Sequence, residues 1–203
     1  MENNITKKRK INTRAIAATA MLSALAYALM FIDISVPIMP FFIKFDISDL
    51  PALIASFAYG PISGIVVCLV KNVINIFVKS QTFGIGELSN FLLGVLFVVP
   101  AGIIYKRKKT RGGAVLGAAV GAILSAVICF FSNYYIVYPL YAKLLMPNEV
   151  ILSAYQAILP SVKNLREAIF IFNVPVTFCK FAIDAIFTFL IYKRISPILK
   201  GKM

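Results

Sequence analysis

Long apolar stretches dominate the sequence and decide which solvent this chain folds in. They run from about 15 to 32, 50 to 78, 88 to 104, 112 to 142 and 168 to 192. The chain is 60% hydrophobic, and only 14% of its residues are charged. This composition is typical of a protein with several membrane-spanning helices. The sequence therefore predicts an all-α, polytopic membrane protein rather than a soluble domain.

The basic residues gather beside these stretches. Of the 21 lysines and arginines, five lie at 7–14, five at 106–111 and four after residue 192. Such clusters mark the cytoplasmic ends of membrane helices, so both termini are expected in the cytoplasm. The net charge of +13 is assigned to topology and to contact with anionic lipid, and no nucleic-acid partner is expected.

The number of helices follows from the same charge pattern. Two basic clusters on one side require an even number of crossings between them, and residues 50–78 would form a helix of about 45 Å, too long for a bilayer core of ~30 Å. Gly60 and Pro61 are the natural break. A single membrane domain, 1–203, is therefore predicted to contain six helices with a short second one, at about 13–32, 49–59, 61–79, 87–105, 112–142 and 165–193. A long outer connection is expected at 143–164.

The last predicted helix carries a polar stripe. Asn173, Thr177, Lys180 and Asp184 share a sector of about 60° on the helix surface. Lys180 is expected near the bilayer midplane, where an exposed charge costs at least ~3 kcal/mol. The stripe is therefore predicted to face protein, water or ligand. The alternative is an internal pair between Lys180 and Asp184, with Thr177 bonded back to its own helix.

A second polar group extends from the third predicted helix into the fourth. Glu87 alone has a simple explanation as an acid in a first helical turn, and an asparagine alone can pair two helices. Convergence on the outer half, with Lys180 below, instead favours a pocket. The members of the group are Lys71, Asn72, Asn75, Lys79, Glu87 and Asn90.

The fifth predicted helix contains small residues in steps of four, which indicates close helix packing. Asn133 ends this series and is the one amide in a long apolar span, so it is a candidate ligand-binding residue, with helix pairing as the alternative. The small residues before it are Gly113, Gly117, Gly121, Ser125 and Cys129.

Several other features bear on function. Cys68, Cys129 and Cys179 lie in apolar runs without a CxxC pair, so they are expected to be small core residues rather than disulfides or metal ligands. Ser48 is predicted to cap the second helix, supported by Asp46. The chain has no histidine, P-loop or zinc-binding spacing, so no enzymatic activity, metal or cofactor is expected, and active transport would require a partner.

The order of these elements resembles the riboflavin-binding S components of the energy-coupling-factor (ECF) vitamin transporters. The resemblance covers nearly the whole chain, and "GELSNF" and "NYYIVYPLY" are its most specific segments. It implies a membrane subunit that captures riboflavin as a transported substrate under a lid formed by the loop 33–48. It also implies two kinds of partner, a membrane coupling subunit and two cytoplasmic ATPases, in a bacterial plasma membrane.

The resemblance further assigns roles to individual residues. In the first helix, Ala20, Ala24 and Ala28 match the surface that docks on the coupling subunit, although packing within the chain would also explain them. The family holds its ligand with an asparagine in the fifth helix and a Pro-Phe-Asn-x-x-Lys motif in the last. Asn133 matches the former, whereas Thr177 replaces the motif's asparagine, so Asn173 is expected to supply the missing amide. The expected ligand contacts are Asn133, Lys180, Thr177, Asn173, Glu87, Asn90, Asn75, Asp46 and Phe45.

Three rival functions stay open on the sequence alone. The replacement at Thr177 favours an S component for another vitamin. A stand-alone secondary transporter would use Lys180 and Asp184 to couple transport to protons. A structural or assembly protein of the membrane would use the polar residues only for packing.

Overall fold

The structure, a computed structural model, describes residues 13–40 and 42–200, with side chains through residue 192. Most of the two terminal basic clusters, and residue 41 of the predicted lid, lie outside the described residues. The described chain is almost entirely helical. Its helices are α1 (Thr13–Phe31), α2 (Asp49–Tyr59), α3 (Pro61–Val78), α4 (Ile85–Arg107), α5 (Arg111–Ser132), α6 (Tyr138–Leu144), α7 (Asn148–Gln156), α8 (Leu165–Ala168) and α9 (Val174–Lys200).

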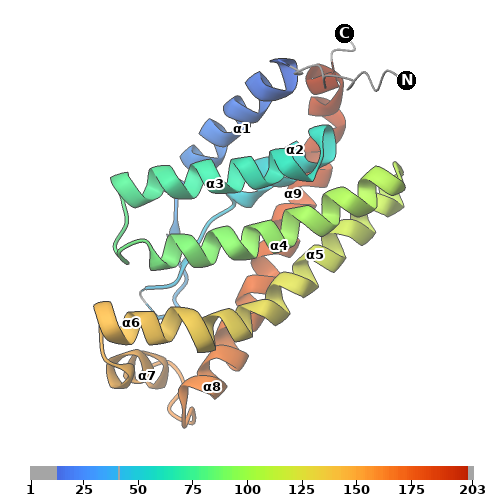
Figure 1. Ribbon diagram of the computed structural model, residues 1–203. Coiled ribbons are helices and arrows are strands. Elements are labelled where there is room, and N and C mark those ends of the chain that lie inside the picture. The colour runs from blue at the N-terminus through green and yellow to red at the C-terminus, as the bar shows by residue number, and fades with distance from the viewer. Residues whose placement is uncertain (1–12, 41, 201–203) are drawn as a thin grey trace, which may run out of the picture.

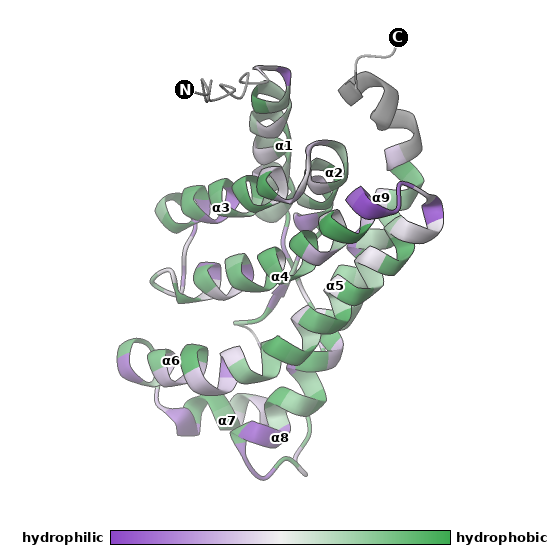
Figure 2. Cartoon of the chain, turned by 45° about the vertical axis from the view of Figure 1, so that its right-hand side comes forward, coloured by the Kyte–Doolittle hydropathy of each residue, from purple (hydrophilic) through white to green (hydrophobic). Residues whose placement is uncertain are grey.

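Five helical segments within the described residues are long and apolar enough to cross a membrane. They are Thr13–Phe31, Pro61–Val78, Ile85–Arg107, Arg111–Leu144 and Leu165–Tyr192. Figure 2 shows that apolar residues dominate these helices, whereas polar residues gather in the connections and in α7 and α8. The prediction of an all-α polytopic membrane protein is confirmed at this level.

The helix α2 is too short to belong to that group, with 11 residues. It nevertheless lies in the centre of the fold and packs against α1, α3, α4 and α9, and nine of its residues are buried. Gly60, with a φ of 105° that L side chains rarely adopt, separates α2 from α3. Its backbone conformation allows the chain to turn directly into Pro61 at the start of α3.

The two helices predicted at 112–142 and 165–193 are not regular throughout. Each contains a π-helical turn, η1 (Asn133–Val137) and η2 (Ile169–Asn173). Pro139 and Pro175 each follow two residues after these turns. A proline cannot donate the backbone hydrogen bond that a regular helix requires, and a π-helical turn relieves that conflict locally. Asn133 and Asn173 lie at the ends of the two turns.

Two connections contain elements that were not predicted. The connection 143–164 contains the helix α7, whose buried Ile151 and Tyr155 pack in one core cluster with residues of α6 and η2. The loop after α1 contains a short antiparallel pair, β1 (Ile34–Ser35) and β2 (Lys44–Phe45). In Figure 1 the start of α1, the α4–α5 turn and the end of α9 lie toward the upper right, and α6–α8 lie toward the lower left.

The predicted seam of small residues brings α4 and α5 into backbone contact. A Cβ atom on Gly117 would lie 2.8 Å from the carbonyl oxygen of Ala101, and one on Gly121 would lie 2.3 Å from that of Phe97. The hydroxyl of Ser125 donates a hydrogen bond of 2.9 Å to the carbonyl of Leu93. Small side chains are therefore required along this contact because the two backbones leave no room for larger ones.

We expect Gly121→Ala to destabilise the protein by about 1 to 3 kcal/mol, because the new methyl group has to push the backbone of α4 away. Thermal unfolding in detergent, followed by circular dichroism, measures this loss. Gly112→Ala is the matched control, since the nearest atom to its new Cβ is 4.0 Å away. Equal melting temperatures for the two variants would contradict the close contact.

Candidate functional site

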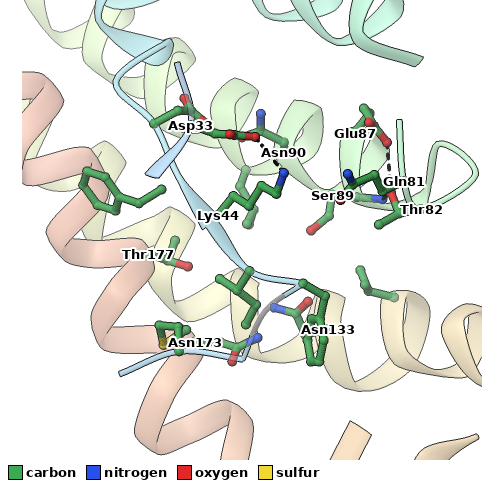
Figure 3. Close-up of a pocket in the computed structure, with 18 of the residues that line it drawn as sticks. Asp33, Lys44, Gln81, Thr82, Glu87, Ser89, Asn90, Asn133, Asn173 and Thr177 are labelled. Atoms are coloured by element: carbon green, nitrogen blue, oxygen red, sulfur yellow. Dashed lines mark hydrogen bonds and ion pairs between the residues drawn. The ribbon is translucent and has the colours of Figure 1, made fainter. Parts of the chain in front are cut away.

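A cavity of about 290 Å³ opens between the loop 33–48, the end of α3, the first half of α4, the end of α5 and the first turns of α9. Its volume lies near the lower end of the range of small-molecule sites, ~300 to 1,000 Å³. Figure 3 shows polar side chains reaching it from several elements. All of the predicted ligand contacts line it: Asn133, Lys180, Thr177, Asn173, Glu87, Asn90, Asn75, Asp46 and Phe45.

Lys180 lies where the loop meets the wall of the cavity. Its ammonium group donates hydrogen bonds to Asp46 Oδ2 (3.3 Å) and Asn90 Oδ1 (3.1 Å), and it lies 3.2 Å from Asp49 Oδ2. The alternative of an ion pair between Lys180 and Asp184 one turn away is wrong. Lys180 instead joins α9 to the loop, to the start of α2 and to α4.

A second lysine is buried beside it. Lys71, expected near the outer face, is fully buried and donates hydrogen bonds to Asp49 Oδ1 (2.6 Å) and Ser48 Oγ (2.7 Å). The predicted role of Ser48 as a helix cap is wrong, because its side chain makes no capping bond and donates to Asp46 instead. Asp49 is the first residue of α2 and pairs with both Lys71 and Lys180. This pairing could not be predicted from the local sequence, because the fold brings Asp49 to lysines that are distant in the chain.

The position of Asp46 fixes its charge. Burial alone would raise the pKa of its carboxyl group, but the positive charges of Lys180 and Lys71 and the hydrogen bonds from Ser48 lower the pKa to about 2. Asp46 therefore stays ionised at every pH at which the protein would function. The carboxylate holds the inner end of the loop against the two lysines.

A thiol joins two of the predicted contacts. The amide of Asn133 donates a hydrogen bond of 3.0 Å to Cys129 Sγ, which lies 3.1 Å from the hydroxyl of Thr177. Cys129 is buried and lines the cavity. Sequence reasoning placed Cys129 in a packing seam and missed this contact. Asn133, Cys129 and Thr177 thus form one polar group on the cavity wall.

Asn173 belongs to a different network. Its amide nitrogen donates to Tyr138 Oη (2.8 Å), and its amide oxygen accepts from Tyr155 Oη (2.6 Å). The two tyrosine hydroxyls also bond to each other, and burial raises the pKa of Tyr155. This closed set of three groups ties α7 to α6 and η2. The sequence analysis did not identify Tyr138 or Tyr155, because they lie in different helices and nothing in their sequence spacing indicates that they meet.

Glu87 organises the part of the cavity wall at the α3–α4 connection. Its carboxylate accepts hydrogen bonds from Asn75 (2.9 Å), Ser80 (3.0 Å) and Thr82 (3.1 Å). Glu87 is 5% exposed, so it fixes the connection between α3 and α4 from the inside. Asn90, one turn along α4, bonds to Asn72 of α3 at 3.3 Å.

At the mouth of the cavity, Asp33 bridges two lysines. Its carboxylate lies 3.0 Å from both Lys44 of the loop and Lys79 at the end of α3, as Figure 3 shows for Lys44. Partial burial would raise the pKa of Asp33, but its hydrogen bonds with the lysines outweigh burial and lower it. This cluster was not predicted and closes the outer side of the loop against the helices.

The remaining predicted residues face away from the cavity. Ala20, Ala24 and Ala28 are exposed, whereas the buried residues of α1 lie on another face. Packing within the described chain therefore does not explain the alanine spacing. Cys68 and Cys129 are buried as expected, but Cys179 is exposed, so the expectation of a core position is wrong for that residue.

We expect Asp49→Asn to destabilise the protein strongly, by about 3 to 5 kcal/mol, because Lys71 and Lys180 lose a buried counter-charge. Asp33→Asn is the matched control, since Asp33 also contacts two lysines but in a partly solvated setting, and its loss should cost less than about 1 kcal/mol. Melting temperatures in detergent compare the two. A loss at Asp33 as large as that at Asp49 would contradict the distinction.

The chain is similar to known transporter subunits. The family model for substrate-specific components of ECF transporters matches residues 14–196. The chain is 31% identical over 196 residues to the riboflavin transporter RibU of Staphylococcus aureus, covering 95% of this chain and 97% of the relative. It is 30% identical over 133 residues to the riboflavin transporter FmnP of Bacillus subtilis, covering 64% and 70%.

The fold is also similar to a solved structure, described as the S component of a bacterial ECF transporter. The superposition has a TM-score of 0.73 at 29% identity and covers 94% of this chain and 99% of that chain. The family match, the relative aligned over nearly its whole length and the shared fold agree with one another. The chain belongs to the substrate-specific components of the ECF transporters.

Proposed function

We propose that this chain captures riboflavin from outside a bacterial cell and delivers it as part of an ECF transporter, together with a membrane coupling subunit and two ATPases. The similarity to the riboflavin transporter of Staphylococcus aureus over 95% of the chain carries this proposal. The cavity supports it, because it combines apolar walls with a few directional polar groups.

The proposed topology has six spans and both termini in the cytoplasm, with α2 as a short span covered by protein. The basic cluster at 106–111 lies at the α4–α5 turn, toward the same end of the molecule as the start of α1 and the end of α9 (Figure 1). Clustered lysine and arginine favour the cytoplasmic side. The cavity then opens toward the outside, where the vitamin is captured.

The chemistry of riboflavin suits the two ends of the cavity. Its flat ring carries a uracil-like edge of donors and acceptors, which suits the amide of Asn133 and the hydroxyl of Thr177. Its ribityl chain of hydroxyls suits the outer half, where Glu87, Asn75 and Asn90 lie. Phe45 and Val176 contribute apolar wall. The ligand thus lies between α5, α9 and the loop.

Lys180 connects this ligand to the loop. Because its ammonium group already contacts Asp46, Asp49 and Asn90, a ligand acceptor has to share it with them or replace one of them. We therefore assign Lys180 two roles, as a donor at the pocket floor and as the anchor of the loop 33–48. The loop acts as the lid because its carboxylate at Asp46 reaches that anchor.

The structure changes how the replacement at Thr177 is interpreted. The amide of Asn173 already serves Tyr138 and Tyr155, so Asn173 has only part of its bonding capacity left for the ligand. Cys129 instead holds the hydroxyl of Thr177. We propose that Thr177 and Cys129 together stand where other members use one asparagine, with Asn173 in support.

The coupling subunit is proposed to dock on α1. This helix exposes a row of small side chains, Ala20, Ala24 and Ala28. Small residues allow close helix approach in a bilayer, which suits a partner that is itself a membrane protein.

We expect the purified protein to bind riboflavin and to quench its fluorescence. Lys180→Met should weaken this binding by about 1 to 3 kcal/mol, because a ligand acceptor and the lid both lose their hydrogen-bond donor. Lys143→Met, at an exposed lysine of α6, should bind as the unmodified protein does. Absence of quenching, or displacement of riboflavin by a different vitamin at lower concentration, would contradict the assignment. Uptake that needs no ATPase partner would favour a secondary transporter.

Thr177→Val should weaken riboflavin binding by about 0.5 to 1.5 kcal/mol, since it removes a hydroxyl while keeping the shape. Thr177→Asn should bind at least as tightly as the unmodified protein. In a Cys129→Ala background the loss from Thr177→Val should shrink, because the two side chains act together. Fully additive losses in a fluorescence titration would show that Cys129 and Thr177 act separately.

A further inference from the structure

A third carboxyl group lies directly beneath the lid anchor and has no assigned role. Asp184, one turn inward of Lys180 on α9, is 0% exposed. Neither of its oxygens has a hydrogen-bond partner among the described residues. An ionised carboxylate in such a place costs several kcal/mol, so its protonation state requires an explanation.

The charges around Asp184 supply an explanation for its protonation state. The charged groups that act on Asp184 are Asp49 of α2, Lys180 of its own helix, Asp46 of the lid and Lys71 of α3. The neighbouring helix α5 has its one charged residue, Arg111, at its far end. Two lysines are already balanced by two aspartates in direct ion pairs. A negative charge on Asp184 would leave the buried cluster with one anion too many.

The balance of charges in this buried cluster changes when the lid opens. Asp46 belongs to the lid, so lid opening would carry its carboxylate into water while Lys71 and Lys180 stay on their helices. Only Asp49 would then remain to balance two cations. Asp184, four residues from Lys180 on the same helix, is placed to restore the balance if it ionises.

We propose that Asp184 is a proton-binding site that couples lid closure to proton uptake. With the lid closed, Asp184 carries a proton and the cluster is neutral. When the lid opens, the O–H bond of Asp184 breaks, the proton passes to water that enters the opened cavity, and the carboxylate pairs with Lys180. The net charge of the buried cluster is then zero in both states, which a low-dielectric interior favours.

The sign of the pH effect follows directly. Closure consumes one proton, so riboflavin affinity should fall as pH rises, by up to about tenfold for each pH unit. Asp46 does not contribute, because its pKa of about 2 keeps it ionised throughout. Riboflavin carries no group that ionises near neutral pH. This inference rests on the proposed function, because it treats riboflavin as the ligand under the lid.

The experiment compares the unmodified protein with Asp184→Asn, which mimics the protonated acid, from mildly acidic to mildly alkaline pH. Riboflavin affinity of the unmodified protein should fall with pH, and that of Asp184→Asn should stay constant and high. Calorimetry in buffers of different ionisation enthalpy should show up to one proton taken up per riboflavin in the unmodified protein and none in the variant. Glu149→Gln, at an exposed acid of α7 outside the cavity lining, is the control and should keep both properties. A pH-independent affinity in the unmodified protein, or the same slope in Asp184→Asn, overturns the proton site while leaving riboflavin capture intact.

Ligand-free melting provides a second test that does not depend on riboflavin. A proton held only in the folded, closed state stabilises it at low pH, and this stabilisation is lost as pH rises. The melting temperature of the unmodified protein should therefore fall relative to that of Asp184→Asn across the same pH range. A constant difference overturns the proton site, and a protein that binds no riboflavin at any pH overturns the proposed function instead.

Discussion

The buried ion pairs of Lys71 and Lys180 with Asp46 and Asp49 are the constraint on which the rest of the structure depends. An unpaired charge at these depths would cost several kcal/mol, so none of the four side chains can leave without a replacement. The pairs join α3 and α9 to the start of α2 and to the lid. They fix the position of a helix that is too short to cross the membrane alone.

This cluster also holds the loop 33–48, the proposed lid, against the helices. Its inner end is held by Asp46 at Lys180, and its outer end by Asp33 and Lys44, with Lys79 beyond. The two attachments differ in strength, because the inner one is buried and the outer one is partly solvated. In the proposed function, opening of this lid therefore depends on the inner attachment, next to the proposed ligand contacts, where a ligand or a proton can change the balance of charges.

Local patterns in the sequence predicted features that lie within one helix or at its end. The glycine steps of α5, the break at Gly60 and the polar face of α9 all follow from spacing. The sequence did not reveal Asp49 as the partner of Lys71 and Lys180, or the contact between Cys129 and Thr177, since each joins residues far apart in the chain. The alternative partner for Lys180, Asp184, is suggested by its spacing of four residues, but the fold supplies Asp46 and Asp49 instead.

Asn133 and Asn173, two of the asparagines that line the cavity, are positioned by irregular backbone. Each lies at a π-helical turn that a proline two residues later makes necessary. Each is also held by other side chains of the protein, Asn133 by Cys129 and Asn173 by Tyr138 and Tyr155. These contacts fix the two amides in place, which lowers the entropy cost of ordering them when a ligand binds. In the proposed capture of riboflavin, these fixed amides favour tight binding, and opening the lid has to break the ion pair of Asp46 with Lys180.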